Sequence, residues 1–163
     1  MEIRLARPDD LDEVVAIYNA AVPGRLATAD TAPVTVDSKR QWFEAHDAAR
    51  RPLWIAEVEE AMAGWCSLEA FNSRPAYDAT LELSVYVSPG FERMGIGRGL
   101  VQEAIGACPG LGVRTLVGLV FAHNAPSLRL LERLGFVRWG FLPRVAELDG
   151  VERDLVIVGL RVG

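Results

Sequence analysis

An alternating glycine pattern, Gly95, Gly97 and Gly99, is the part of the sequence best suited to bind an anion. It follows an apolar run that ends at Ser88-Pro89-Gly90, and helical periodicity begins at Leu100. Glycines let backbone N–H groups converge, and a helix N-terminus adds partial positive charge. The segment lacks the Lys-Ser/Thr ending of a nucleotide P-loop and the glycine spacing of a dinucleotide site. It therefore predicts either a site for a phosphate-bearing ligand or a plain strand-to-helix turn.

Glu82 is a candidate general base, because it lies in an apolar strand pattern, residues 81–87, just before the glycine segment. A partly buried carboxylate has a raised pKa and can accept a proton near neutral pH. Side chains alternate between the two faces of a strand, and by this alternation alone a solvated face is the commoner position for a residue such as Glu82.

Polar residues in two loops could complete such a site. Arg74 and Tyr77 precede the Glu82 strand, where a guanidinium could bind a substrate carboxylate, or both could be surface residues. His123, Asn124 and Ser127 follow an apolar strand pattern, at the end of the strand where open α/β sheets bind ligands. Asn124 or Ser127 could instead cap the next helix. His123 could act as a base, but a single histidine without an evident partner is more typical of a structural or surface position.

The composition is that of an ordinary globular protein, with 163 residues, 50% of them apolar and 24% charged. The length fits one domain spanning residues 1–163. A net charge of −5 without a basic tract argues against nucleic-acid binding. No apolar run reaches membrane length and no signal peptide pattern opens the chain, so we expect no membrane association. Cys66 and Cys108 are too few for a disulfide framework or a zinc site, and we expect them reduced in the core of a cytoplasmic protein.

Hydrophobic periodicity predicts a mixed α/β unit. Proline and acidic residues at 8–10 mark a helix start, and Asp37 is expected to cap a second helix. Glu59-Glu60 separates two apolar runs that predict a hairpin. The expected strands are 3–5, 53–58, 62–68, 81–87, 115–121, 136–145 and 151–162, the later helices are 98–107 and 126–134, and 23–33 and 71–78 are loops.

The order of these features resembles the GNAT acyltransferase superfamily: strand, Gly-x-Gly loop, helix, apolar strand, Asn-x-x-Ser, then Leu131-Glu132-Arg133-Leu134-Gly135-Phe136. More narrowly, the chain is similar to the phosphinothricin and methionine sulfoximine acetyltransferases. The resemblance covers nearly the whole chain, and the combination is more specific than any one motif. The matching segments are Ala16-Ile17-Tyr18-Asn19, Arg40-Gln41-Trp42-Phe43, Arg74-x-x-Tyr77-Asp78-x-Thr80-x-Glu82 and Ser84-Val85-Tyr86-Val87.

The resemblance implies a central mixed, largely antiparallel sheet flanked by helices. Two neighbouring parallel strands, ending here at Val87 and Phe121, would splay apart to admit acetyl-CoA. Glu82 is implied to be the catalytic base, and Arg74 and Tyr77 to bind the substrate. The positions implied to bind acetyl-CoA fall into three groups. Val85, Tyr86 and Val87 lie along the pantetheine arm, and Asn124 and Ser127 lie near the far end of that arm. The pyrophosphate is bound by Arg93, Met94, Gly95, Ile96, Gly97 and Arg98, where Gly97 would leave room for the phosphates.

Two positions depart from the superfamily pattern. Glu92 stands where Gln or Arg usually begins the pyrophosphate loop, and we expect its carboxylate to point away while Arg93 and Arg98 supply positive charge. Leu131 stands where many relatives carry a tyrosine that protonates the leaving thiolate. Coenzyme A thiolate is a fair leaving group, so water can supply that proton.

Together these implications predict an acetyl-CoA-dependent N-acetyltransferase that acts on the α-amine of a small amino acid or analogue and needs no metal. Acetylation of a protein N-terminus or another amine is the alternative within this class. A non-catalytic acyl-CoA-binding sensor is the alternative outside it. The family and the hydrophobic C-terminal strands also suggest a homodimer.

Overall fold

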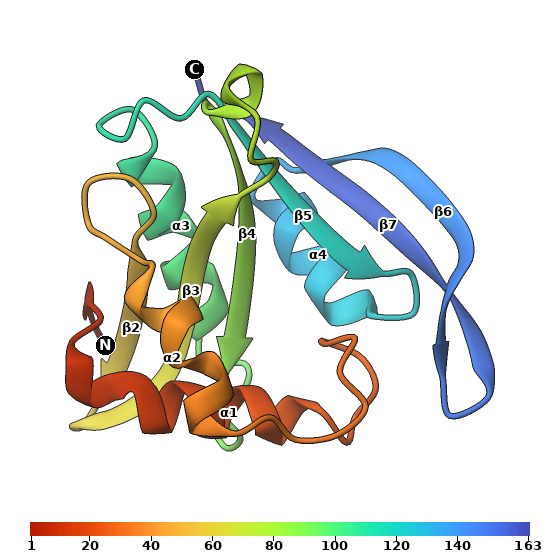
Figure 1. Cartoon of the computed structure of the whole chain (residues 1–163), viewed down its shortest axis with the longest axis horizontal. Coiled ribbons are helices and arrows are strands. Elements are labelled where there is room, and N and C mark those ends of the chain that lie inside the picture. The colour runs from red at the N-terminus through yellow and green to blue at the C-terminus, as the bar shows by residue number, and fades with distance from the viewer.

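The computed structural model describes residues 1–163, and its seven strands form one sheet (Figure 1). The strand order is β1-β2-β3-β4-β5-β7-β6, and every neighbouring pair is antiparallel except β4 with β5. The predicted mixed, largely antiparallel sheet is therefore confirmed. The strands are β1 (Glu2–Leu5), β2 (Leu53–Val58), β3 (Ala61–Ala70), β4 (Thr80–Val87), β5 (Thr115–Phe121), β6 (Val137–Leu148) and β7 (Val151–Arg161).

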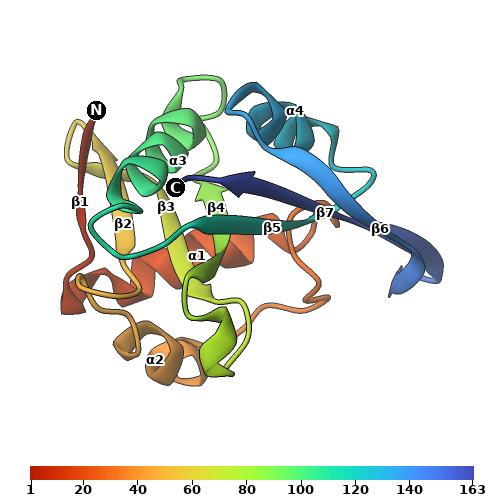
Figure 2. The same cartoon turned by 90° about the horizontal axis from the view of Figure 1, so that it is seen from above.

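Helices cover both faces of this sheet (Figure 2). On one face lie α1 (Leu11–Ala21) and α2 (Val36–Glu44), and on the other lie α3 (Ile96–Ala107) and α4 (Ala125–Arg133). Short 3-10 helices, η1 (Pro8–Asp10) and η2 (Pro75–Tyr77), precede α1 and β4. The larger core lies under α3 and α4, and a smaller one, which includes Trp65, lies under α1. None of the helices is long and apolar enough to cross a membrane.

Local sequence signals account for most element boundaries, but the prediction that Asp37 caps α2 is wrong. Thr35 is the N-cap, and its Oγ1 accepts a hydrogen bond of 3.1 Å from the backbone N–H of Ser38. Asp37 lies in the first turn instead, where its carboxylate pairs with Arg40 at 3.2 Å. An acidic side chain at either position favours the helix N-terminus, so the composition alone does not identify the cap.

The pairing between β4 and β5 is confined to the beginnings of both strands. It joins Thr80 to Thr115, Leu81 to Leu116 and Glu82 to Val117. Beyond these positions, residues 83–87 pair only with β3, and residues 118–121 pair only with β7. The two parallel strands therefore diverge towards their carboxyl ends, as the resemblance implied.

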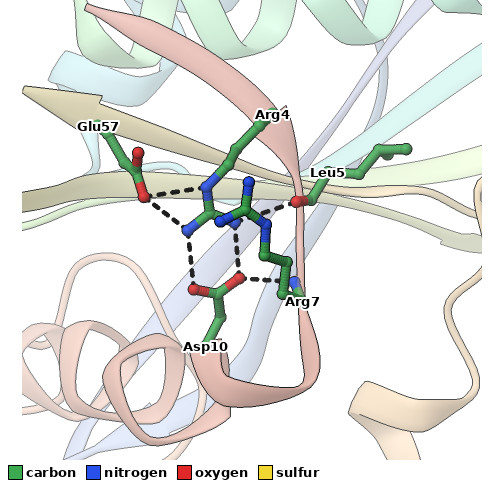
Figure 3. Close-up of polar contacts among 5 residues, drawn as sticks. All are labelled: Arg4, Leu5, Arg7, Asp10 and Glu57. Carbon is green, nitrogen blue, oxygen red and sulfur yellow. Dashed lines mark hydrogen bonds and ion pairs between the residues drawn. The ribbon is translucent and has the colours of Figure 1, made fainter. Parts of the chain in front are cut away.

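A charged cluster fastens the first strand to the start of α1 and to β2 (Figure 3). The guanidinium of Arg4 donates to both carboxylate oxygens of Asp10, at 2.8 and 2.9 Å, and to Glu57 Oε1 at 2.6 Å. The backbone N–H of Arg7 also donates to Asp10. Burial alone would raise the pKa of Asp10, but the hydrogen bonds from Arg4 and Arg7 outweigh it, so this pKa is lowered.

We expect Arg4→Met to lower the free energy of unfolding by about 3 kcal/mol, because it leaves the buried Asp10 and the half-buried Glu57 without their cation. A lowered folded-state pKa means that the stabilisation by ionised Asp10 is complete above its ordinary pKa of 3.8 and is lost as the pH falls through the lowered value. Urea unfolding of both proteins at pH 7 and at acid pH checks this. The difference between them should shrink below pH 3.8, and a difference that grows there would contradict the assignment.

Candidate active site

Glu82 occupies the last position of β4 that pairs with β5, at the point where these two strands begin to diverge. Its side chain is half-buried. The residues that follow, Val85, Tyr86 and Val87, are also half-buried and line the β4 side of the opening. Their backbone edge towards β5 carries no strand partner, so it is free to pair with an extended ligand.

The segment between β4 and α3 forms a cradle of backbone N–H groups. Gly95 is the N-cap of α3 in the left-handed conformation, with φ +78°, and Arg93 is also left-handed, with φ +61°. Successive N–H groups in such a turn converge on an anion site. No backbone carbonyl accepts from the N–H groups of residues 93–98, and the helix dipole adds positive charge there.

The side chains around this cradle leave it open to a negatively charged group. Arg93, Met94 and Arg98 are exposed, whereas Ile96 is buried beneath the loop. The Glu92 carboxylate accepts a hydrogen bond of 2.8 Å from the N–H of Gly90, so it is turned back onto the preceding turn. This orientation is the one we expected for an acidic residue beside a phosphate site.

Gly97 does not have the expected surroundings. A Cβ at this position would lie 3.1 Å from Leu130 Cδ2 and 3.7 Å from Val87 Cγ2, so it would point into packed side chains rather than into space for phosphates. Gly97 therefore allows α3 to lie close to α4 and to the end of β4. Among Gly95, Gly97 and Gly99, Gly95 is the one with open space around its Cβ position and a positive φ.

On the opposite face of the sheet, α1, α2, β3 and β4 enclose a cavity of about 240 Å³. Aromatic rings form one continuous wall of this cavity. Trp65 and Tyr86 have ring centroids 4.7 Å apart, Trp42 and Trp65 are 5.6 Å apart, and Tyr18 and Tyr86 are 5.2 Å apart. The volume is near the lower end for ligand sites and fits a molecule of amino-acid size.

Two glutamates occupy paired positions of β3 and β4 at this end of the cavity, and one of them, Glu69, lines it. Glu69 on β3 lies directly opposite Glu82 in the antiparallel register, so their side chains leave the same face of the sheet. The indole N–H of Trp42 donates to Glu69 Oε1 at 2.5 Å and holds that carboxylate at the cavity wall. Burial, and then the charge of Glu69, raise the pKa of Glu82. A carboxylate in this setting is suited to accept a proton near neutral pH.

The loop 22–33 closes the site on the side where the strands diverge. The carbonyl of Arg25 accepts a hydrogen bond of 2.7 Å from His123 Nε2, and the carbonyl of Ala27 accepts one of 3.1 Å from the Tyr86 hydroxyl. Asn124 Nδ2 donates to the Leu26 carbonyl at 3.3 Å. His123 also stacks on the ring of Phe121, which fits the structural interpretation of this histidine.

Asn124 has a second structural function at the start of α4. It is the N-cap of this helix, and its Oδ1 accepts a hydrogen bond of 3.3 Å from the N–H of Ser127. The capping interpretation is thus confirmed for Asn124. Asn124 and Ser127 both lie on the β5 side of the opening. Their contact with a cofactor stays a prediction.

Arg74 and Tyr77 lie apart from the cavity, in the loop before β4. Arg74 is exposed, and its guanidinium has no hydrogen-bond or ion-pair partner. Tyr77 is 42% exposed and packs edge-on against Phe71. Both residues precede Glu82 along the strand direction, whereas the cavity extends beyond Glu82 towards Ser84 and Tyr86.

Sequence reasoning missed most of the residues that line the cavity. No sequence pattern assigns a function to Trp65, Glu69, Ser67 or Lys39, all of which line the cavity. The usable signals are three of the matching segments, which contain Tyr18, Trp42, and Ser84 with Tyr86, residues that line the cavity. Leu131 is buried in the core with 2% exposure, so no proton donor stands at that position.

Comparison with known proteins identifies the family to which the chain belongs. The sequence model described as "Acetyltransferase (GNAT) family" matches residues 13–136, more than half of the chain. The chain belongs to the GNAT acetyltransferase family. It is therefore an enzyme of the N-acetyltransferase type, and the splayed strands and the N–H cradle are features of a GNAT protein.

Individual GNAT relatives match the chain over nearly their whole length. It is 46% identical to the "Putative phosphinothricin acetyltransferase YwnH" of Bacillus subtilis, over 98% of each chain. It is 30% identical to the L-methionine sulfoximine/L-methionine sulfone acetyltransferase of Salmonella typhimurium, over 99% of this chain and 95% of that one. A solved acetyltransferase structure from Salmonella typhimurium "with its cofactor Acetyl-CoA" superposes with a TM-score of 0.94 at 30% identity, over 100% of this chain and 94% of that one.

Proposed function

We propose that this GNAT enzyme transfers the acetyl group of acetyl-CoA to the α-amine of a small amino acid or analogue of the phosphinothricin and methionine sulfoximine type. The observation that carries the proposal is the position of Glu82 at the start of two binding features. From Glu82 onwards β4 and β5 diverge and lead to the N–H cradle on the α3 face of the sheet, and a cavity of amino-acid size lies beyond Glu82 on the α1 face. Relatives with these acceptors in their names, and one solved with acetyl-CoA, support the choice.

Acetyl-CoA has a continuous set of binding groups along β4 and α3. The N–H groups of residues 93–98, with the Arg93 and Arg98 guanidinium groups, bind the pyrophosphate. The free backbone edge of Val85, Tyr86 and Val87 pairs with the pantetheine arm. Met94, Gly95, Ile96 and Gly97 form the loop itself, and Asn124 and Ser127 contact the arm from the β5 side.

The reaction is a direct transfer without a covalent enzyme intermediate. The neutral amine nitrogen attacks the thioester carbonyl, and Glu82 accepts the proton that the nitrogen loses, directly or through water. Backbone N–H groups near Tyr86 stabilise the oxyanion of the tetrahedral intermediate. The carbon–sulfur bond then breaks, and the thiolate takes a proton from water, because Leu131 has none to give. Glu82 releases the amine proton to the hydroxide left behind, which regenerates the base. Every step uses groups of the chain and water, so the proposal includes no metal.

A test of this function is thiol release from acetyl-CoA across a panel of amines. Phosphinothricin, methionine sulfoximine and methionine sulfone should be acetylated, as identified by mass spectrometry. Preference for a peptide N-terminus would favour the alternative within the class. Tight binding of acetyl-CoA with no turnover of any amine would favour a sensor.

Arg74 is proposed to bind the acceptor carboxylate, with Tyr77 beside it. We expect Arg74→Ala to raise KM for amino-acid acceptors by about ten- to a hundredfold, because a charged hydrogen bond contributes about 1.5–3 kcal/mol. The KM for the matching amines without a carboxylate should rise much less. Steady-state kinetics on both sets check this, and equal effects on the two sets would remove Arg74 from the site.

The proposal also covers the assembly and setting of the protein. We propose one catalytic domain, residues 1–163, that forms a homodimer through β6, an edge strand with exposed apolar side chains that include Trp139, Phe141 and Val145. Long apolar edge strands tend to pair with another chain. A cytoplasmic setting fits the two free, buried cysteines. Sedimentation analysis of the purified protein tests the dimer, and neither nucleic acid nor membrane is part of the proposal.

A further inference from the structure

The cavity beside Glu82 contains one cation, and that cation has no carboxylate partner. Lys39 on α2 lines the cavity, and its ammonium group lies 5.6 Å from the centroid of the Tyr18 ring. It forms no ion pair, although Glu69 lines the same cavity. Contact with an aromatic ring contributes only modestly and leaves all three ammonium hydrogens able to donate.

A second polar group in the cavity is buried without a partner. Ser67 is 0% exposed and lines the cavity, and its hydroxyl has no hydrogen-bond partner in the protein. Ser84, directly opposite in the strand register, lines the cavity too. An unsatisfied buried hydroxyl costs free energy, so its presence on a cavity wall indicates a ligand group that satisfies it.

The order of residues along β4 fixes which end of an acceptor enters the cavity. Arg74 lies before the strand, Glu82 lies near its start, and Ser84 and Tyr86 follow on the same face as Glu82. Strand residues advance by about 3.3 Å each, so the cavity extends several ångströms beyond Glu82 in the direction away from Arg74. With the α-amine at Glu82 and the carboxylate towards Arg74, the acceptor side chain points into the cavity.

We propose that Lys39 and Ser67 form a subsite for oxygen atoms at the end of the acceptor side chain, and that they select acceptors with a terminal oxyanion or oxo group. This inference rests on the proposed function for the positions of the amine and of the carboxylate. The aromatic wall of Trp42, Trp65 and Tyr86 contacts the methylene groups, the Lys39 ammonium binds the oxygens electrostatically, and the Ser67 hydroxyl donates to one of them. The expected order of kcat/KM is phosphinothricin, then methionine sulfone, then methionine.

Substitution of Lys39 tests the electrostatic part of the subsite. In Lys39→Met the aliphatic stem is kept and the charge is lost, so the preference for phosphinothricin over methionine should fall by about tenfold. Lys39→Arg keeps the charge and should retain most of the preference. Arg40→Met is the matched control, because Arg40 is an exposed neighbour that pairs only with Asp37. An unchanged preference in Lys39→Met would overturn the proposal, and so would equal losses on phosphinothricin and methionine.

Substitution of Ser67 separates recognition from folding. Ser67→Ala removes an unsatisfied hydroxyl, so the melting temperature should stay unchanged or rise, while kcat/KM for methionine sulfone relative to methionine falls several-fold. Loss of stability without a change in this ratio would show that the hydroxyl serves the fold, and would overturn its place in the subsite.

A binding measurement keeps the subsite testable apart from catalysis. Lys39 is the only lysine in the chain, so reductive ¹³C-methylation yields one lysine signal, distinct from that of the α-amino group. Addition of phosphinothricin should shift this signal, and methionine at the same concentration should shift it much less. If no amine is acetylated but the signal still responds in this way, the proposed function fails and the subsite stands. Turnover of phosphinothricin without any shift overturns the subsite alone.

Discussion

Gly95→Val is expected to weaken acetyl-CoA binding by about a hundredfold or more, because it removes the turn that makes the N–H groups of residues 93–98 converge. Gly95 has φ +78°, a conformation that costs a residue with a side chain about 1–2 kcal/mol and a β-branched one more. The loop relieves this strain by changing its backbone angles. Two lost hydrogen bonds to a charged pyrophosphate would cost about 3 kcal/mol or more.

Calorimetric titration with acetyl-CoA measures this effect, and Gly112→Val is the matched control. Gly112 has φ +70° and, like Gly95, open space at its Cβ position, but it lies in the loop between α3 and β5. The control should have the same kind of backbone strain and near wild-type affinity. A folded Gly95→Val protein with wild-type affinity would show that the cradle is not the pyrophosphate site. Gly97→Val is a poorer test, because its side chain would collide with Leu130.

Features that depend on a few neighbouring residues were predictable from the sequence. The bounds of β2 (Leu53–Val58) and β5 (Thr115–Phe121) match the predicted strands, because a run of β-branched and apolar residues ends at clear turn signals. The Glu59-Glu60 turn has positive φ at both residues, 51° and 67°, as a tight hairpin requires. The position of the N–H cradle also follows from local glycine spacing.

Features that depend on register or on the direction of one bond were not predictable. The pairing of Glu69 with Glu82 exists only because β3 and β4 align in one register, and a shift of one residue would place them on opposite faces. The same register brings Ser67 to the cavity wall. The interpretation of Gly97 failed because its Cβ direction depends on how α3 packs against Leu130, a contact far along the chain.

Loop 22–33 shows the same limit at the level of tertiary structure. The sequence predicts a loop over residues 23–33, but nothing in these residues indicates that loop carbonyls accept hydrogen bonds from His123, Asn124 and Tyr86. Tyr86 lies 59 residues after its loop partner, and His123 and Asn124 each lie 98 residues after theirs. Long-range contacts of this kind follow from the topology of the sheet, so local patterns contain no signal for them.

Glu82→Gln is expected to lower kcat near neutral pH by about 10²–10⁴-fold and to leave acetyl-CoA affinity nearly unchanged. The attacking nitrogen must be neutral, and an α-amine is mostly protonated at pH 7, so the reaction needs a base there. The defect should shrink as the pH approaches the pKa of the amine, because the solution then deprotonates the nitrogen without help.

Glu69→Gln is the matched comparison, because the glutamine keeps an oxygen that can accept from Trp42 and loses only the charge opposite Glu82. Burial and the charge of Glu69 both raise the pKa of Glu82, so the base form of the wild-type enzyme is lost as the pH falls through a raised value. Without the Glu69 charge, the acid limb of kcat against pH should move to lower pH, while kcat above that limb stays within a few-fold of wild type. A wild-type kcat of the Glu82→Gln enzyme at neutral pH would show that Glu82 is a structural residue and not the general base. If instead the large loss occurred in Glu69→Gln, the general base would be Glu69.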